Sequence, residues 1–135
     1  MDIDECFRKG LVRKTEVDKE LILSLIDMSA IKEKTVNTAR INPENISVYV
    51  SVAYDSLREM LEAICIKHGY KVLSHTCMGE LLRGILDEFD HDGFDRLRYI
   101  RNSINYYGKR VDHAQGKELI RKIFLMKNDL LKKHL

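Results

Sequence analysis

Apolar residues recur every three or four positions along most of this chain, which is the period of an amphipathic α-helix. The clearest early run extends to about Thr38 and begins at Thr15 and Asp18, whose spacing resembles a capping box with Asp in place of Glu. Its apolar positions are Val17, Leu21, Ile22, Leu25, Ile26, Met28 and Ile31. A short helix over residues 2–9 is expected before it, with Gly10 as its stop.

A third helix is predicted to open at Asn42, with Pro43 in its first turn and Glu44 complementing the positive helix end. Gly69 is expected to end it. Its apolar stripe consists of Ile46, Val50, Ala53, Leu57, Leu61 and Ile64. The local run ISVYVSVAY is rich in strand-forming residues, so a strand is the alternative there. The length of the periodic pattern beyond that run favours the helix.

Two more helices follow in the second half of the chain. Ser74 is expected to cap the fourth, which runs through Phe89 and stops in the DHDG turn at residues 90–93. The fifth begins near Phe94 with its apolar residues facing inward. Gly108, a residue suited to a left-handed cap, is expected to end it.

A last helix is predicted from its N-cap Asp112 through about Leu131. Every predicted element is helical and the connections are short. This pattern predicts an all-α fold, an up-and-down bundle of four main helices with one or two short extra helices. The 135 residues are enough for a single domain over residues 1–135 with a core of its own. One proline in the whole chain agrees with long uninterrupted helices.

Composition and charge narrow the class of protein only slightly. The formal net charge of +2 is too small to indicate a nucleic-acid binder by itself. No stretch reaches the roughly 18 apolar residues of a membrane span, and the N-terminal segment MDIDECFRKG lacks the apolar run of a signal peptide. Cys6, Cys65 and Cys77 show no metal spacing and are interpreted as buried, reduced thiols, which suits a cytoplasmic location. We expect no membrane contact, metal or organic cofactor.

One charged residue interrupts an apolar stripe. In the segment RNSINYYG, Arg101 follows Leu97 by four residues and precedes Ile104 by three, so the three share one helix face. A guanidinium on that face must be paired or must line a wet cleft. One interpretation is a structural ion pair with Asp55 or Glu59. The other is an anion site, because the planar guanidinium matches phosphate oxygens.

Neutral donors and aromatic rings stand close to Arg101 in the sequence. Asn102 and Asn105 add amide donors, and Tyr106 and Tyr107 can stack on bases or donate hydroxyl hydrogen bonds. Together with the arginine, these residues are the candidate nucleotide- or RNA-binding site.

Two segments of the chain, YDSLREMLEAICIKHGYKVLSHTCMGELL and FDRLRYIRNSINYYG, resemble a HEPN domain, a small helical nucleotide-binding domain widespread in prokaryotes. The resemblance covers roughly residues 44–110. The family's Gly-Tyr turn and Ser-His helix start are matched by Gly69, Tyr70, Ser74 and His75. Its signature is an arginine followed by a polar residue, with four to six residues between the arginine and a histidine. Arg101 and Asn102 match the first half of that signature.

The second half of the signature is missing, because Tyr106, Tyr107 and Gly108 stand where the histidine is expected. In family members that are ribonucleases, the resemblance implies metal-independent cleavage. The histidine assists attack of the RNA 2′-hydroxyl, the arginine stabilises the phosphate charge, and two protomers build one cleft. Tyrosine is a poor base, since a pKa of about 10 leaves roughly 0.1% phenolate at neutral pH. His113 is the alternative displaced base, whereas His75 is interpreted as a capping and packing residue.

The resemblance therefore implies a homodimeric HEPN-type nucleotide- or RNA-binding module of a prokaryotic toxin–antitoxin or defence system, as companion of a small nucleotidyltransferase. Two alternatives stay open, so catalysis is not decided. The first is a metal-independent endoribonuclease that uses Arg101 with Tyr106, Tyr107 or His113. The second is a structural dimer or adaptor without a ligand, in which Arg101 is only an ion-pair partner.

Overall fold

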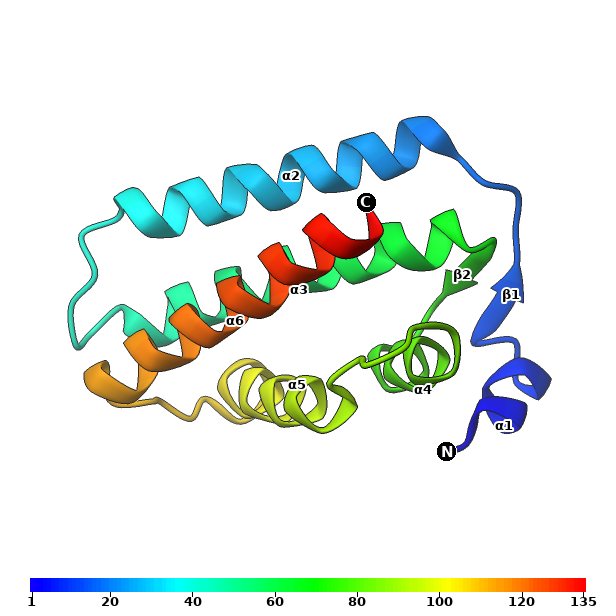
Figure 1. The fold of residues 1–135 in the computed structure, drawn as a ribbon. Coiled ribbons are helices and arrows are strands. Elements are labelled where there is room, and N and C mark those ends of the chain that lie inside the picture. The colour runs from blue at the N-terminus through cyan, green and yellow to red at the C-terminus, as the bar shows by residue number, and fades with distance from the viewer.

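Six helices and one small sheet make up the computed structural model of residues 1–135 (Figure 1). In chain order the elements are α1 (Ile3–Arg8), β1 (Val12–Lys14), α2 (Lys19–Thr38), α3 (Ile46–Lys67), β2 (Tyr70–Val72), α4 (His75–Ile85), α5 (His91–Tyr107) and α6 (His113–His134). The prediction of a mostly helical chain is confirmed. None of the helices is both long and apolar enough to cross a membrane.

The expectation that every element is helical is wrong at two places. β1 and β2 form an antiparallel pair in which Val12 lies opposite Val72 and Lys14 lies opposite Tyr70. Each strand has three residues, which is too few for the alternation of buried and exposed positions to stand out in a sequence. The two valines face the core and anchor the pair.

Helix α3 is the centre of the fold and is buried along almost its whole length. Helix α2 packs on one side of it, and α4 and α5 cross its other side (Figure 1). This position explains the strand-like run ISVYVSVAY, because a helix covered from several directions is apolar on several faces. The helix prediction there is confirmed. The largest fully buried side chains of α3 are Ile46, Tyr54, Leu57, Met60, Leu61 and Ile64.

The up-and-down order holds for α2 and α3, but α6 runs beside α3 in the same direction (Figure 1). At the start of both helices, the Val111 backbone N–H donates to Ser47 Oγ at 2.9 Å. Near their ends, Lys67 Nζ donates to the His134 carbonyl at 2.8 Å. The chain returns to the starting end through α4 and α5, so the bundle is not a simple alternation of directions.

Helix ends follow the expected capping chemistry at most positions. The side chains of Asp18, Ser74 and Asp112 each accept a hydrogen bond from a backbone N–H in the first turn of α2, α4 and α6. These bonds satisfy donors that have no partner within the helix. Gly108 ends α5 in the left-handed conformation, with φ of 62°.

Three boundaries differ from the prediction. Helix α2 begins at Lys19 with Asp18 as its N-cap, whereas the predicted capping box places the cap at Thr15 and Asp18 inside the first turn. Asn42 does not cap α3 but forms a turn, its Oδ1 accepting from the N–H groups of Glu44 and Asn45 at 2.9 Å, and the helix begins at Ile46. The predicted stop after α4 is a start instead, because Asp90 caps α5 by accepting from Gly93 N–H at 2.9 Å. The same residue types favour turns and N-caps, so the sequence pattern alone did not separate these roles.

A disulfide between Cys6 and Cys77 joins α1 to α4, and Cys65 is a buried free thiol. The interpretation of all three cysteines as reduced is therefore wrong for two of them. The bonded pair is separated by 71 positions in the sequence, so no local spacing indicated it. The cysteine-based reason for a cytoplasmic location falls with this pair.

Reducing the Cys6–Cys77 disulfide should lower the free energy of unfolding by about 4 kcal/mol, because the unfolded chain regains the freedom of a long closed loop. Urea unfolding with and without a phosphine reductant measures this difference, and a Cys6→Ser variant should show no response to the reductant. Alkylation of the unreduced, denatured chain should label Cys65 alone. Labelling of all three cysteines would contradict the assignment.

Candidate functional site

The guanidinium of Arg101 lies between α5 and α3. Its Nη2 donates to Asp55 Oδ1 at 3.3 Å, and its Cζ lies 5.5 Å from the ring centroid of Tyr54. Of the two ion-pair partners considered from the sequence, Asp55 is thus the one found, while Glu59 pairs with Lys32 of α2. The Arg101 side chain is only 15% exposed, and its Nε is buried with no hydrogen-bond partner. The arginine therefore has a structural partner, and its buried Nε–H has none.

The packing of α5 on α3 decides where this arginine points. Phe94 and Leu97 are buried, and the ring of Phe94 stacks on Tyr54 with centroids 6.1 Å apart. Arg101 follows one turn later on the same face. One further turn along, Asn105 Oδ1 accepts a hydrogen bond from Ser51 Oγ at 2.9 Å.

Two more arginines stand near Arg101, and we call Arg58, Arg98 and Arg101 the arginine cluster. Arg98 lies one turn before Arg101 on α5, and Arg58 lies one turn after Asp55, the partner of Arg101, on α3. The other two have partners on their own helices, with Arg58 bonded to Glu62 at 3.1 Å and Arg98 to Asp95 at 2.8 Å. Partly exposed pairs of this kind contribute only about 0.3–0.5 kcal/mol. An incoming anion can therefore compete for these two arginines at small cost.

His75 lies at the edge of the arginine cluster. Its Nδ1 is 3.2 Å from the hydroxyl oxygen of Tyr54, whose ring also contacts Arg101. Burial, followed by the charges of Arg58 and Arg101, lowers the pKa of His75 to about 4. Burial also raises the pKa of Tyr54. Both groups are therefore neutral at neutral pH.

The remaining candidates from the α5 sequence lie in different surroundings. Asn102 is half-buried and makes no side-chain hydrogen bond in the structure, whereas Asn105 is bonded to α3. Tyr106 and Tyr107 are 71% and 74% exposed in the last turn of α5, so their rings are free to meet a ligand. His113 begins α6, where its Nε2 is buried without a partner and no hydrogen bond links it to Arg101.

Sequence reasoning missed four members of this site, namely Tyr54, Arg58, His75 and Arg98. Tyr54 has the pattern of a core residue, and Arg58 that of a solvated helix face. The spacing of Arg98 and Arg101 by three residues was the one available signal, since it places both on neighbouring parts of one face. His75 comes from α4, and only the crossing of α4 over α3 brings it near the arginines.

The site offers donors and positive charge, and no set of metal ligands. No three His, Cys, Asp or Glu side chains in the chain are placed to hold one metal ion. With one unpartnered Nε, two loosely paired arginines and a neutral histidine, the arrangement is suited to an oxyanion such as a phosphate group.

Comparison of the chain with protein-family models, with curated proteins and with solved structures gave no match. The HEPN domain accordingly stays a resemblance carried by the residues quoted from the sequence.

We expect acid to destabilise the fold through His75. Its pKa in the folded protein lies near 4, below the ordinary 6.5, so the unfolded chain binds more protons between these two values. The contribution of neutral His75 is therefore complete above pH 6.5 and is lost as the pH falls towards 4. Urea unfolding at a series of pH values measures this slope.

The His75→Asn variant is the matched control for this pH effect, because an amide keeps a hydrogen-bonding group near Tyr54 but does not titrate. Its unfolding free energy should depend less steeply on pH in that window. An imidazole of His75 that titrates near pH 6.5 by NMR would contradict the burial argued here.

Proposed function

We propose that this protein is a HEPN-type nucleotide- or RNA-binding module whose phosphate site is the arginine cluster. The observation that carries the proposal is the buried, unpartnered Nε of Arg101, on a side chain that is paired with Asp55 and has Arg98 one turn before it on α5. A buried guanidinium N–H without an acceptor is unfavourable in the free protein. A phosphate oxygen that approaches through the exposed 15% of the side chain can supply an acceptor after a small rotation of the guanidinium.

In this proposal the groups of the site have distinct tasks. Asp55 and the Tyr54 ring hold the guanidinium of Arg101 in a fixed plane, which lowers the entropy lost when a phosphate binds. Arg58 and Arg98 add charge to neutralise the anion. Tyr106 and Tyr107 contact the base or the ribose, because exposed rings near a phosphate site can stack on a nucleobase.

The side chains that could act as general base favour binding over cleavage. Tyr106 is exposed, and no side chain is bonded to its hydroxyl to take its proton. His75 is the histidine nearest to the cluster, but a pKa of about 4 makes it a weak proton acceptor at neutral pH. His113 is not bonded to any member of the cluster. The ribonuclease alternative therefore lacks a well-matched general base.

The biological setting in the proposal comes from the resemblance alone. It comprises the toxin–antitoxin or defence system, the nucleotidyltransferase companion and the homodimer. The adaptor alternative is supported by one feature of the structure, namely that each arginine of the cluster already has a carboxylate partner.

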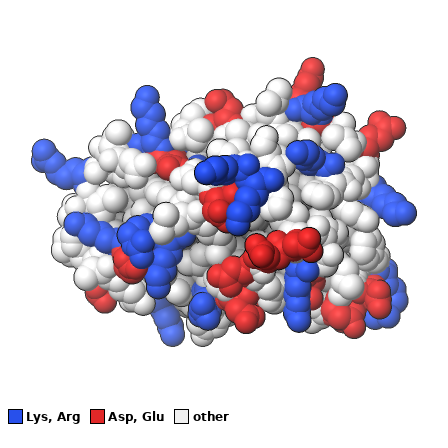
Figure 2. All heavy atoms as spheres, viewed as in Figure 1, with Lys and Arg blue, Asp and Glu red and all other residues white.

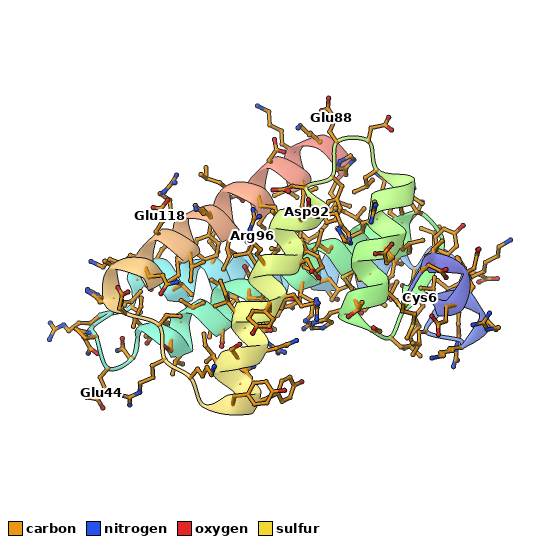
Figure 3. All side chains as sticks on the ribbon, turned by 90° about the horizontal axis from the view of Figure 1, so that it is seen from below. Cys6, Glu44, Glu88, Asp92, Arg96 and Glu118 are labelled. Atoms are coloured by element: carbon orange, nitrogen blue, oxygen red, sulfur yellow. A yellow bond between two sulfur atoms is a disulfide. The ribbon has the colours of Figure 1, made fainter.

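Arg101→Ala should weaken binding of a nucleotide or short RNA by about 10- to 150-fold, the loss expected for charged hydrogen bonds worth roughly 1.5–3 kcal/mol. Arg101→Lys should recover only part of the lost affinity, because an ammonium group lacks the planar arrangement of donors of a guanidinium. Arg96→Ala is the matched control, since Arg96 is an exposed arginine of α5 that lies towards α6 (Figure 3). Fluorescence anisotropy in EDTA measures the affinities.

The same samples, incubated with RNA in EDTA, decide between the alternatives. Binding without cleavage supports a recognition module, and cleavage that requires Arg101 would replace it with a ribonuclease. If Arg101→Ala lowers the melting temperature and the wild-type protein binds no nucleotide or RNA, the adaptor hypothesis replaces the binding proposal.

Substitution of Tyr106 separates stacking from hydroxyl chemistry. Tyr106→Ala should lower the affinity by the roughly 1–3 kcal/mol of one stacked base, whereas Tyr106→Phe should keep it. The comparison uses a mononucleotide and a short single-stranded RNA under one salt condition. A Phe variant as weak as the Ala variant would show that the hydroxyl, and not the ring, makes the contact.

A further inference from the structure

Helix α2 has a second apolar face that no part of the chain covers. Its inner face packs on α3, with Ser29 and Val36 buried. A second row begins just before the helix and advances by alternate steps of four and three residues. We call this row the outer stripe: Val17, Leu21, Ser24, Met28, Ile31 and Thr35. All six are exposed, and its four large apolar side chains are 42–49% exposed.

The spacing of the outer stripe is that of a helix-pairing seam. Apolar residues at alternate steps of three and four positions let one helix insert its side chains between those of another. Its two polar members fit such a seam. Ser24 is small, and the Thr35 hydroxyl is bonded to the Ile31 carbonyl at 2.8 Å, which leaves the methyl group to face outward. A helix face that contacts only solvent is expected to carry polar and charged residues instead.

Charges beside the outer stripe identify the helix that fits it. The first half of the α2 region is predominantly acidic, with Glu16, Asp18, Glu20 and Asp27. The second half is basic where it is not engaged by other helices, with Lys34 and Arg40, whereas Lys32 and Glu33 are paired with Glu59 of α3 and Lys127 of α6. A parallel copy would place acidic half against acidic half, whereas an antiparallel copy places each acidic half against a basic one. The surface is therefore complementary to itself when one copy is reversed.

We propose that the outer stripe is a self-association surface on which α2 of a second copy of this chain packs antiparallel. When the outer stripes of the two antiparallel copies face each other, Leu21 lies opposite the partner's Ile31. Ser24 lies opposite the partner's Met28, so a small residue faces a large one. Glu20 then lies near the partner's Lys34. The two Asp27 side chains meet at the two-fold axis and form the one unfavourable contact.

This dimer would place the two phosphate sites far apart. Helix α2 lies on one side of α3, and α4 and α5 lie on the other, as two perpendicular views agree (Figures 1 and 3). Arg98 and Arg101 of the arginine cluster belong to α5. Each protomer would then hold a complete site of its own. This arrangement differs from the shared cleft that the HEPN resemblance implies, and it does not depend on the proposed nucleotide binding.

Sedimentation equilibrium of the full chain tests the proposal. The wild-type protein should be dimeric at micromolar concentration, and Leu21→Glu combined with Ile31→Glu should be monomeric with unchanged circular dichroism. Leu125→Glu is the control, since Leu125 is 58% exposed on α6 and lies outside the stripe. A monomeric wild type at several hundred micromolar, or a double variant that stays dimeric, would overturn the proposal.

Charge variants keep the test independent of folding. Glu20→Lys should weaken the dimer at least several-fold, and adding Lys34→Glu should restore it. Asp27→Asn should strengthen the dimer, because it removes the like-charge contact at the axis. If Asp27→Asn weakens the dimer, or the Lys34→Glu addition fails to restore it, the register is wrong and the proposal fails.

Cross-linking determines the direction of pairing. Under mild oxidation, Asp27→Cys should form a covalent dimer, since the two introduced thiols meet at the axis. Glu20→Cys should not, because its equivalents lie far apart in an antiparallel pair but adjacent in a parallel one. A covalent dimer from Glu20→Cys would overturn the proposal. The Arg101→Ala variant should remain dimeric. A monomeric Arg101→Ala variant would place the interface on the other side of α3 and would also overturn the proposal.

Discussion

The burial of α3 on several sides is the constraint on which the rest of the structure depends. A helix in this position must find partners for every polar side chain it carries, because an unpaired charge in the interior is costly. Glu59, only 4% exposed, is paired with Lys32 of α2. Asp55 is paired with Arg101 of α5. The surrounding helices are thus held in register by ionic contacts as well as by apolar packing.

The same constraint fixes the structural role of Arg101 and is compatible with the ligand-binding role that we propose for it. Asp55 needs one positive partner, and a single Nη2 contact provides it, so the remaining donors of the guanidinium are available for another acceptor. A lysine would neutralise Asp55 equally well but would leave no rigid donor plane for a ligand. The choice of arginine at this position is therefore explained better by pairing plus binding than by pairing alone.

Much of the fold followed from local chemistry that a sequence displays directly. The caps at Ser74 and Asp112 and the stop at Gly108 depend on neighbouring residues. The Asp55–Arg101 pair joins residues 46 positions apart, and the sequence offered it only as one of two candidate pairs. The three-residue strands, the Cys6–Cys77 bond and the direction of α6 depend on long-range contacts that no local pattern encodes. His75 joined the site for the same reason, since α4 reaches the arginines only through the tertiary fold.

The distribution of charge favours a small ligand over a long nucleic acid. Acidic and basic side chains are interspersed on the face drawn in Figure 2, without a continuous basic surface. Each arginine of the cluster also has a carboxylate partner, so the long-range field of the site is weak. Extended RNA gains affinity by releasing counterions along many phosphates, which requires several unpaired cations in a row. A site that recognises one phosphate through short-range geometry, with one or two stacked rings beside it, is better matched to a nucleotide or the end of a short single strand.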